Sequence, residues 1–298
     1  MTEPLRLLCF SYAGGNAQTY VRWRRHLGPD IEVRPMQLPG HGERIGERPR
    51  HRWDDLLADV RAGLGHMTDR PIALFGHSLG ALIAFECARI LVAEHGVQPV
   101  RLLVSGHRAP HLPLREGVLH RLPDAEFLAK LSERSRALRA LTDPEFRKLL
   151  LPMLRADFTA SETYAFTEGP PLTCPITALG GAQDEDATLP ELSAWQRHTT
   201  GRFDLATFEG DHFFIDDAWQ RVVSTVGDRL GGAGGERVAV RGSGRVPSAL
   251  AGSDGSGRVR TYCSVPTGGG VTDGSMVDRM YSRVLPGSNS WTNRSIQR

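Results

Sequence analysis

The chain has 298 residues, enough for one complete α/β domain with a buried core. Its 36 Lys and Arg nearly balance its 34 Asp and Glu, so no strong field favours nucleic acid or an anionic membrane as partner. No run of about 18 apolar residues occurs, and the N-terminus has neither a basic leader nor a cleavage site, so we expect a cytoplasmic protein that does not span a membrane. The four cysteines are far apart without a CxxC pair, which favours buried thiols over a metal site.

Six short apolar runs recur along the chain and are separated by longer, helix-compatible stretches. Strands that are buried on both faces of a sheet have this pattern, and intervening helices indicate parallel crossovers. The runs cover residues 6–11, 31–38, 71–76, 100–106, 175–181 and 203–210. The prediction is an open, mostly parallel sheet with helices on both faces.

The loops after the first two runs are rich in glycine. In the loop 11–20 (SYAGGNAQTY), Gly14 and Gly15 would let the backbone approach a substrate closely, although a plain tight turn needs the same residues. After the second run, His41 of LPGHGER is expected to brace its turn rather than to react.

The third run leads directly into Gly76-His77-Ser78-Leu79-Gly80, which satisfies the pattern G-x-S-x-G. The residues that follow, 79–92, are apolar almost all round and predict a helix buried against the sheet. Strand, serine and buried helix in this order favour a nucleophile elbow over a structural turn serine. The N–H of Leu79 would then be one oxyanion donor, and the loop 11–20 would provide the other, with Ala13 preferred over Tyr12.

A long insertion separates the fourth and fifth runs. The 68 residues between them exceed what one crossover helix needs, and they predict a helical lid over about 107–171, with an embellished crossover as the alternative. Residues 124–131 have helical spacing, and Asp143-Pro144 is typical of an N-cap followed by proline. Pro152 is expected to end or kink this second helix.

A serine nucleophile needs a base and an orienting acid, which follow it in the order acid, then histidine, in hydrolases of this architecture. Asp184 lies just past the fifth run, with Glu185 and Asp186 as competitors, and His212 lies just past the sixth. We expect Ser78, His212 and Asp184 to form the catalytic triad. His77 is expected to point away from the serine.

The composition changes after residue 230. Residues 231–298 contain 14 glycines, 10 serines and 9 arginines but only 4 acidic residues. Such a segment buries too little apolar surface to offset the entropy of ordering it, so we expect a disordered tail after a single domain over 1–230.

Several phrases together resemble one family. They are CFSYAGGNA, LPGHGER, FGHSLGALIAFECAR, LLLPMLRADF, CPITALGG and GDHFF, spread over residues 5 to 230. The chain resembles the type II thioesterases that accompany polyketide synthases and nonribosomal peptide synthetases. Two features depart from that family: the stretch 132–143 lacks a Gly-Gly-Thr-Pro-like turn, and the tail has no counterpart.

The resemblance implies an α/β-hydrolase fold and hydrolysis of acyl groups from the phosphopantetheine thiol of an acyl or peptidyl carrier protein. It places the triad on Ser78, Asp184 and His212 and the oxyanion donors on Ala13 and Leu79, with no metal or cofactor. The enzyme itself is expected to be a monomer. The alternatives are a small-molecule carboxylesterase, a cyclising or product-releasing thioesterase, and a non-catalytic ligand-binding protein.

Carrier proteins are usually acidic, so the docking surface should be locally basic. Two arginine clusters are candidates, and either could instead be a solvated face. The clusters are Arg22, Arg24 and Arg25, and Arg134, Arg136 and Arg139.

Overall fold

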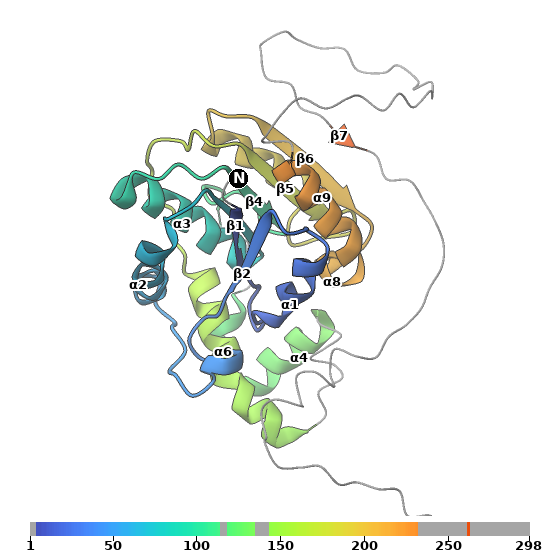
Figure 1. The fold of residues 1–298 in the computed structure, drawn as a ribbon. Coiled ribbons are helices and arrows are strands. Elements are labelled where there is room, and N and C mark those ends of the chain that lie inside the picture. The colour runs from blue at the N-terminus through green and yellow to red at the C-terminus, as the bar shows by residue number, and fades with distance from the viewer. Residues whose placement is uncertain (1–3, 114–117, 135–142, 232–260, 263–298) are drawn as a thin grey trace, which may run out of the picture.

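A single parallel sheet organises the protein. The computed structural model describes residues 4–113, 118–134, 143–231 and 261–262. The strands lie in the order β2-β1-β3-β4-β5-β6-β7, and every neighbouring pair is parallel (Figure 1). Their bounds are β1 Leu5–Phe10, β2 Ile31–Met36, β3 Ile72–His77, β4 Arg101–Ser105, β5 Ile176–Gly181, β6 Phe203–Phe208 and β7 Thr261–Tyr262. All six predicted strands are confirmed.

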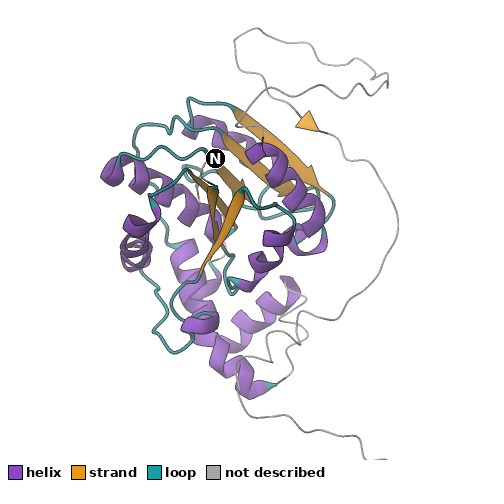
Figure 2. Ribbon diagram, in the orientation of Figure 1, coloured by secondary structure: helices purple, strands orange, loops and turns teal. Residues whose placement is uncertain are grey.

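Helices cover both faces of this sheet (Figure 2). The α-helices are α1 Gln18–Val21, α2 Trp53–Leu64, α3 Leu79–His95, α4 Asp124–Arg134, α6 Pro144–Glu162, α7 Leu189–Ser193, α8 Phe214–Asp217 and α9 Trp219–Gly231. Short 3-10 helices span η1 Arg22–Arg25, η2 Gly42–Arg44, η3 Gly65–Met67, η4 Leu119–Arg121 and η5 Ala194–His198.

Alternate side chains of the strands enter two separate cores. Leu8 and Phe10 of β1 pack on the face that carries α2 and α3, whereas Leu7 and Cys9 pack on the face that carries α1 and α9. This period of two is what a strand with both faces buried requires. Helix α3 is buried on nearly all sides, as its sequence predicts.

The insertion between β4 and β5 forms the expected helical lid, which we define as α4 and α6 (Figure 1). The Asp143 carboxylate accepts a hydrogen bond from the Glu145 N–H, which confirms the predicted cap. Helix α6 continues through Pro152 to Glu162, so of the two expected effects of proline, an end of the helix is wrong and a kink stays a prediction. The two helices share a small apolar core, and α6 reaches the loops after β1 and β2, at the carboxyl edge of the sheet.

Two expectations fall largely outside the described residues. In the expected disordered tail, Thr261 and Tyr262 pair with β6, and the state of the rest stays a prediction. Most of the stretch 132–143, which departs from the family pattern, is also not described. Among the described helices, none is both long and apolar enough to cross a bilayer.

Candidate active site

Ser78 lies on a strained turn between β3 and α3. Its backbone φ of 54° and ψ of −120° make it the one non-glycine residue with positive φ in the described part of the chain. Residues other than glycine rarely adopt this backbone conformation, so the surrounding structure must enforce it. A Cβ on Gly76 would collide with the carbonyl of Gly80, and one on Gly80 would collide with the carbonyl of Phe10. The two glycines of the motif therefore allow the elbow to close.

The three side chains predicted from sequence lie in one hydrogen-bonded line. The Ser78 hydroxyl lies 3.0 Å from Nε2 of His212, and Nδ1 of His212 lies 3.0 Å from Oδ2 of Asp184. With Nδ1 protonated, the imidazole donates to the carboxylate and can accept the serine proton. Asp184 is fully buried, whereas Glu185 is exposed and Asp186 is half-buried. Of the three acidic candidates, Asp184 is the buried one, and its carboxylate bonds the histidine.

The loops that carry Asp184 and His212 are joined by a two-way contact that sequence reasoning missed. The Gln183 N–H donates to the Gly210 carbonyl at 3.0 Å, and the Gln183 side-chain oxygen accepts from the Gly210 N–H at 2.7 Å. A Cβ on Gly181 would crowd the Gly210 carbonyl, so glycine at the end of β5 lets the two loops approach. Their relative position is thereby fixed.

His77 is fully buried and its ring bonds Ser105 of β4, which fits the expectation that it points away from Ser78. Its Nδ1 hydrogen-bonds the Ser105 hydroxyl at 2.9 Å, and its ring centroid lies 5.1 Å from that of His212. Burial, together with the neighbouring His212, holds the pKa of His77 well below its usual value. A neutral ring here places no second positive charge beside an imidazolium on His212.

The N–H groups of Ala13 and Leu79 are the two backbone donors expected to bind an oxyanion beside Ser78. Within the described residues, no group accepts a hydrogen bond from the N–H of Ala13 or of Leu79. By contrast, the Gly15 N–H donates to the Tyr12 carbonyl at 2.8 Å, and the Gly14 N–H donates to Asp157 at 2.7 Å. In the loop after β1, the N–H of Ala13 is thus available to a ligand, while those of Gly14 and Gly15 are not.

Tyr12 ties this loop to the segment that carries His212. Its hydroxyl donates to Oδ2 of Asp216 at 3.0 Å, and its ring packs edge-to-face on Phe213 at 5.4 Å. Burial, reinforced by the negative charge of Asp216, raises the pKa of Tyr12 well above its usual value, so the phenol remains a donor. Tyr12 therefore anchors the loop through its side chain.

His41 does more than brace its own turn. Its Nδ1 faces the Pro39 carbonyl at 3.0 Å, and its Nε2 faces Oδ2 of Asp157 on lid helix α6 at 2.7 Å. A carbonyl and a carboxylate are both acceptors, so the geometry calls for protons on both ring nitrogens. Burial opposes this charge, but Asp157 and the Pro39 carbonyl outweigh it and raise the pKa of His41 above 6.5. His41 and Asp157 form a buried ion pair.

This ion pair gives folding a defined pH dependence. Because the pKa of His41 is raised on folding, its contribution to stability is complete below the unfolded value of about 6.5 and is lost as pH rises through the folded value. In His41→Gln, the amide can still donate to Asp157 but does not titrate. We therefore expect the difference in unfolding free energy between wild type and H41Q to shrink from pH 6 to pH 9 in urea titrations. A difference that stays constant or grows would contradict the charged pair.

Three potential ligand atoms meet beside the triad. Asp184, Asp186 and His212 each offer one atom, and these lie within 4.8 Å of one another. Asp184 and His212 already bond to each other, so an ion held by all three would compete with the line that leads to Ser78.

The basic residues expected at a docking surface differ in their surroundings. Arg22 is engaged within the molecule: it pairs with Asp216 at 3.2 Å and lies over the Trp219 ring. Arg24 and Arg25 are exposed on η1. Arg134 ends α4, and Arg136 and Arg139 lie outside the described residues.

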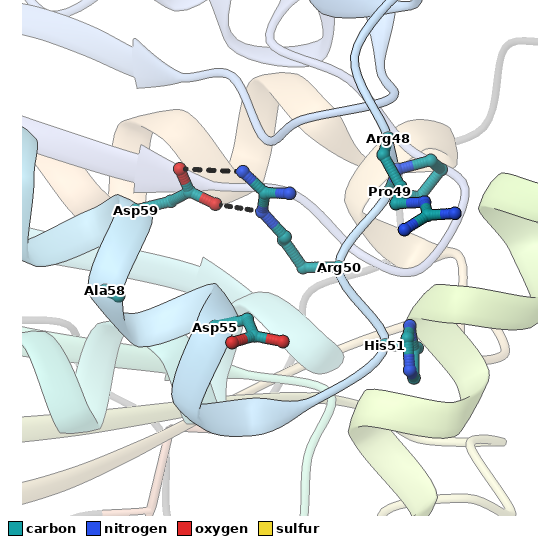
Figure 3. A pocket seen from close by; sticks show the side chains of 7 residues that line it. All are labelled: Arg48, Pro49, Arg50, His51, Asp55, Ala58 and Asp59. Carbon is teal, nitrogen blue, oxygen red and sulfur yellow. Dashed lines mark hydrogen bonds and ion pairs between the residues drawn. The ribbon is translucent and has the colours of Figure 1, made fainter.

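A separate cavity of about 420 Å³ lies between the segment 48–51 and α2, and it contains no triad residue (Figure 3). It mixes both charges, and Arg50 in it is paired with Asp59. This mixture makes the cavity a weaker match for an acidic partner than a purely basic surface.

Comparison with known proteins shows which family the chain belongs to. A family model described as a thioesterase domain matches residues 5–230. Thioesterase PikA5 of Streptomyces venezuelae is 40% identical, over 76% of this chain and 82% of its own length. Linear gramicidin dehydrogenase LgrE of Brevibacillus parabrevis is 39% identical, over 77% and 90%. The solved structure of the RedJ thioesterase from the prodiginine pathway of Streptomyces coelicolor is 38% identical, covers 76% of this chain and 86% of its own, and has a TM-score of 0.71. The chain belongs to the thioesterase family and has the α/β-hydrolase fold.

Proposed function

We propose that this enzyme hydrolyses acyl thioesters on the phosphopantetheine arm of carrier proteins, with Ser78 as nucleophile, His212 as base and Asp184 as its orienting acid. The observation that carries the proposal is the Ser78–His212–Asp184 line at the carboxyl edge of the sheet, with 3.0 Å at each link. Chemically, this arrangement lets an otherwise weak hydroxyl attack a carbonyl.

The reaction proceeds in two acyl transfers. Nε2 of His212 takes the hydroxyl proton as the oxygen of Ser78 attacks the thioester carbonyl, and the Ala13 and Leu79 N–H groups bind the oxyanion. Asp184 stabilises the imidazolium, which protonates the leaving sulfur. His212 then takes a proton from water, the hydroxide attacks the acyl-enzyme, and the proton returns to Ser78 as the carboxylic acid leaves.

The substrate class rests on the relatives. PikA5 and RedJ are named as thioesterases, and RedJ is assigned to a biosynthetic pathway. Another solved relative, 36% identical with a TM-score of 0.70, is the type II thioesterase BorB from the borrelidin cluster. These names share thioester cleavage, in two cases within a biosynthetic pathway or cluster, and from them we infer a carrier-bound acyl chain as the substrate. We expect the reaction to take place in the cytoplasm, with the enzyme as a monomer.

The name of the gramicidin relative denotes an oxidoreductase rather than a hydrolase. A hydride transfer would leave the strained serine and its histidine without a role, so the site favours hydrolysis. A carboxylesterase would use the same triad, and only its substrate would differ.

The experiment that tests the substrate class compares two esters of one acyl group. We expect mass spectrometry to show loss of a propionyl group from the phosphopantetheine of a carrier protein, with slower release of the same acyl group from an oxygen-for-sulfur arm. The Ser78→Ala protein is the matched control and should leave both esters intact. Preferential turnover of the oxyester, or no turnover of the carrier thioester, would contradict the proposal.

A further inference from the structure

Lid helix α6 makes two contacts with one residue of the loop after β1, which we call the oxyanion loop (residues 11–15). Oδ2 of Asp157 accepts the Gly14 N–H at 2.7 Å. One helical turn earlier, the Leu154 side chain covers Gly14 so closely that an added Cβ would lie 2.5 Å from its Cδ2. Asp157 and Leu154 are three residues apart, so they share a face of the helix.

Asp157 is itself held from a third segment. The oxygen that accepts from Gly14 also accepts from Nε2 of His41, and both side chains are almost fully buried. His41, in the loop after β2, thus holds the Asp157 carboxylate in place, and this carboxylate in turn holds Gly14 in the loop after β1. A buried carboxylate with two donors on one oxygen cannot move without leaving a donor or a charge unpaired.

The contact of Asp157 with Gly14 affects the neighbouring oxyanion donor, the Ala13 N–H. The Gly14 N–H belongs to the peptide group that follows Ala13, so its orientation constrains the backbone of Ala13 on the carboxyl side. On the amino side, the Tyr12 hydroxyl bonds Asp216 in the body of the enzyme. The loop is therefore braced at one end by the body and at the other by the lid. Displacement of α6 would remove only the second brace.

We propose that Asp157 is a positioning residue through which the seating of lid helix α6 orders the oxyanion loop, so that the Ala13 donor is aligned only under a seated lid. The inference rests on the proposed function, in which Ala13 N–H stabilises the oxyanion. It adds that the lid takes part in assembling the reacting site, besides covering the substrate.

The test removes the acceptor and follows oxyanion stabilisation separately from substrate binding. In Asp157→Ala, we expect kcat per active site on propionyl-carrier protein to fall about 10- to 100-fold while KM stays nearly unchanged. The fall in kcat should be no larger than the fall caused by loss of a whole oxyanion donor. The inhibition constant of an alkyl trifluoromethyl ketone should rise in parallel, because its adduct with Ser78 carries an oxyanion. Active sites are counted by the endpoint of fluorophosphonate labelling, so a partly unfolded population does not enter kcat.

Three further variants separate positioning from general stability. Asp157→Asn keeps an oxygen that can accept from Gly14 and should recover most of kcat. Leu154→Ala, which removes the other contact on Gly14, should lower kcat and weaken ketone binding in the same direction, and it serves if D157A does not fold. Arg155→Ala is the matched control, since Arg155 holds α6 to His120 and Asp124 but does not touch Gly14; its kcat should stay near wild type.

The outcomes distinguish this inference from the proposed function. If the wild type is active and both D157A and L154A keep its kcat and its affinity for the ketone, the coupling is overturned and the proposed function still stands. A parallel loss in R155A would overturn it as well, because general loosening of the lid would then suffice. A wild type that does not cleave the carrier thioester would remove the proposed function itself.

Discussion

Replacing Ser78 by alanine is expected to abolish hydrolysis, with kcat falling by about 10⁴- to 10⁶-fold, because the remaining backbone donors cannot form an acyl-enzyme. Labelling by a fluorophosphonate should be lost at the same time, since the probe needs the activated hydroxyl. The measurements are acid release from propionyl-carrier protein and the mass of the labelled enzyme. The fold should remain intact, since alanine has no atom beyond the Cβ that serine already places there.

Ser193→Ala is a suitable control for this variant. Ser193 ends α7 and is not buried, and its hydroxyl donates to the Leu189 carbonyl of its own helix. Wild-type rates and labelling are expected for it. If labelling of the Ser78→Ala protein persisted, the nucleophile would have to be another residue.

Replacing Asp184 by asparagine is expected to lower kcat by about 10⁴-fold while KM changes little. Asparagine has nearly the same shape, but its amide can donate to Nδ1 of His212 and thereby favour the tautomer whose Nε2 bears a proton. That tautomer cannot accept the proton of Ser78. Steady-state kinetics on the acylated carrier protein gives both parameters.

Two neighbouring acidic residues provide the comparison. Glu185→Gln changes an exposed side chain, and Asp186→Asn leaves intact the backbone N–H that Asp186 donates to Oδ1 of Asp184. Both variants should keep kcat within a few-fold of wild type, as is usual for polar changes away from the reacting groups. A loss of the D184N size in D186N would move the orienting acid to residue 186.

The fold and the triad of Ser78, His212 and Asp184 could be predicted because each depends on local sequence. A strand buried on both faces needs consecutive apolar residues, so β1 to β6 are visible as short runs, and Ser78 follows from a turn that only flanking glycines allow. Asp184 and His212 follow from a simple rule of topology, since residues just past the ends of parallel strands meet at one edge of the sheet.

The contacts that hold these groups could not be predicted, because they join residues that are distant in sequence. His41 and Asp157 are 116 positions apart, and Tyr12 and Asp216 are 204 apart. Each partner by itself looks like an ordinary loop or helix residue, and no periodicity links the two. Asp157 is buried on α6 and such a charge needs a partner, but the sequence does not identify His41 as that partner.

Pro152, which does not end α6, lowers the resistance of the helix to bending at that point. It has no N–H, so the carbonyl of Lys148, four residues earlier, lacks its donor, and bending there breaks one hydrogen bond fewer than elsewhere in the helix. Leu154 and Asp157 lie on the carboxyl-terminal side of Pro152, whereas the exposed Leu149 lies on its amino-terminal side. Bending at Pro152 would therefore displace the amino-terminal half of the helix while the contact between Asp157 and Gly14 stays in place.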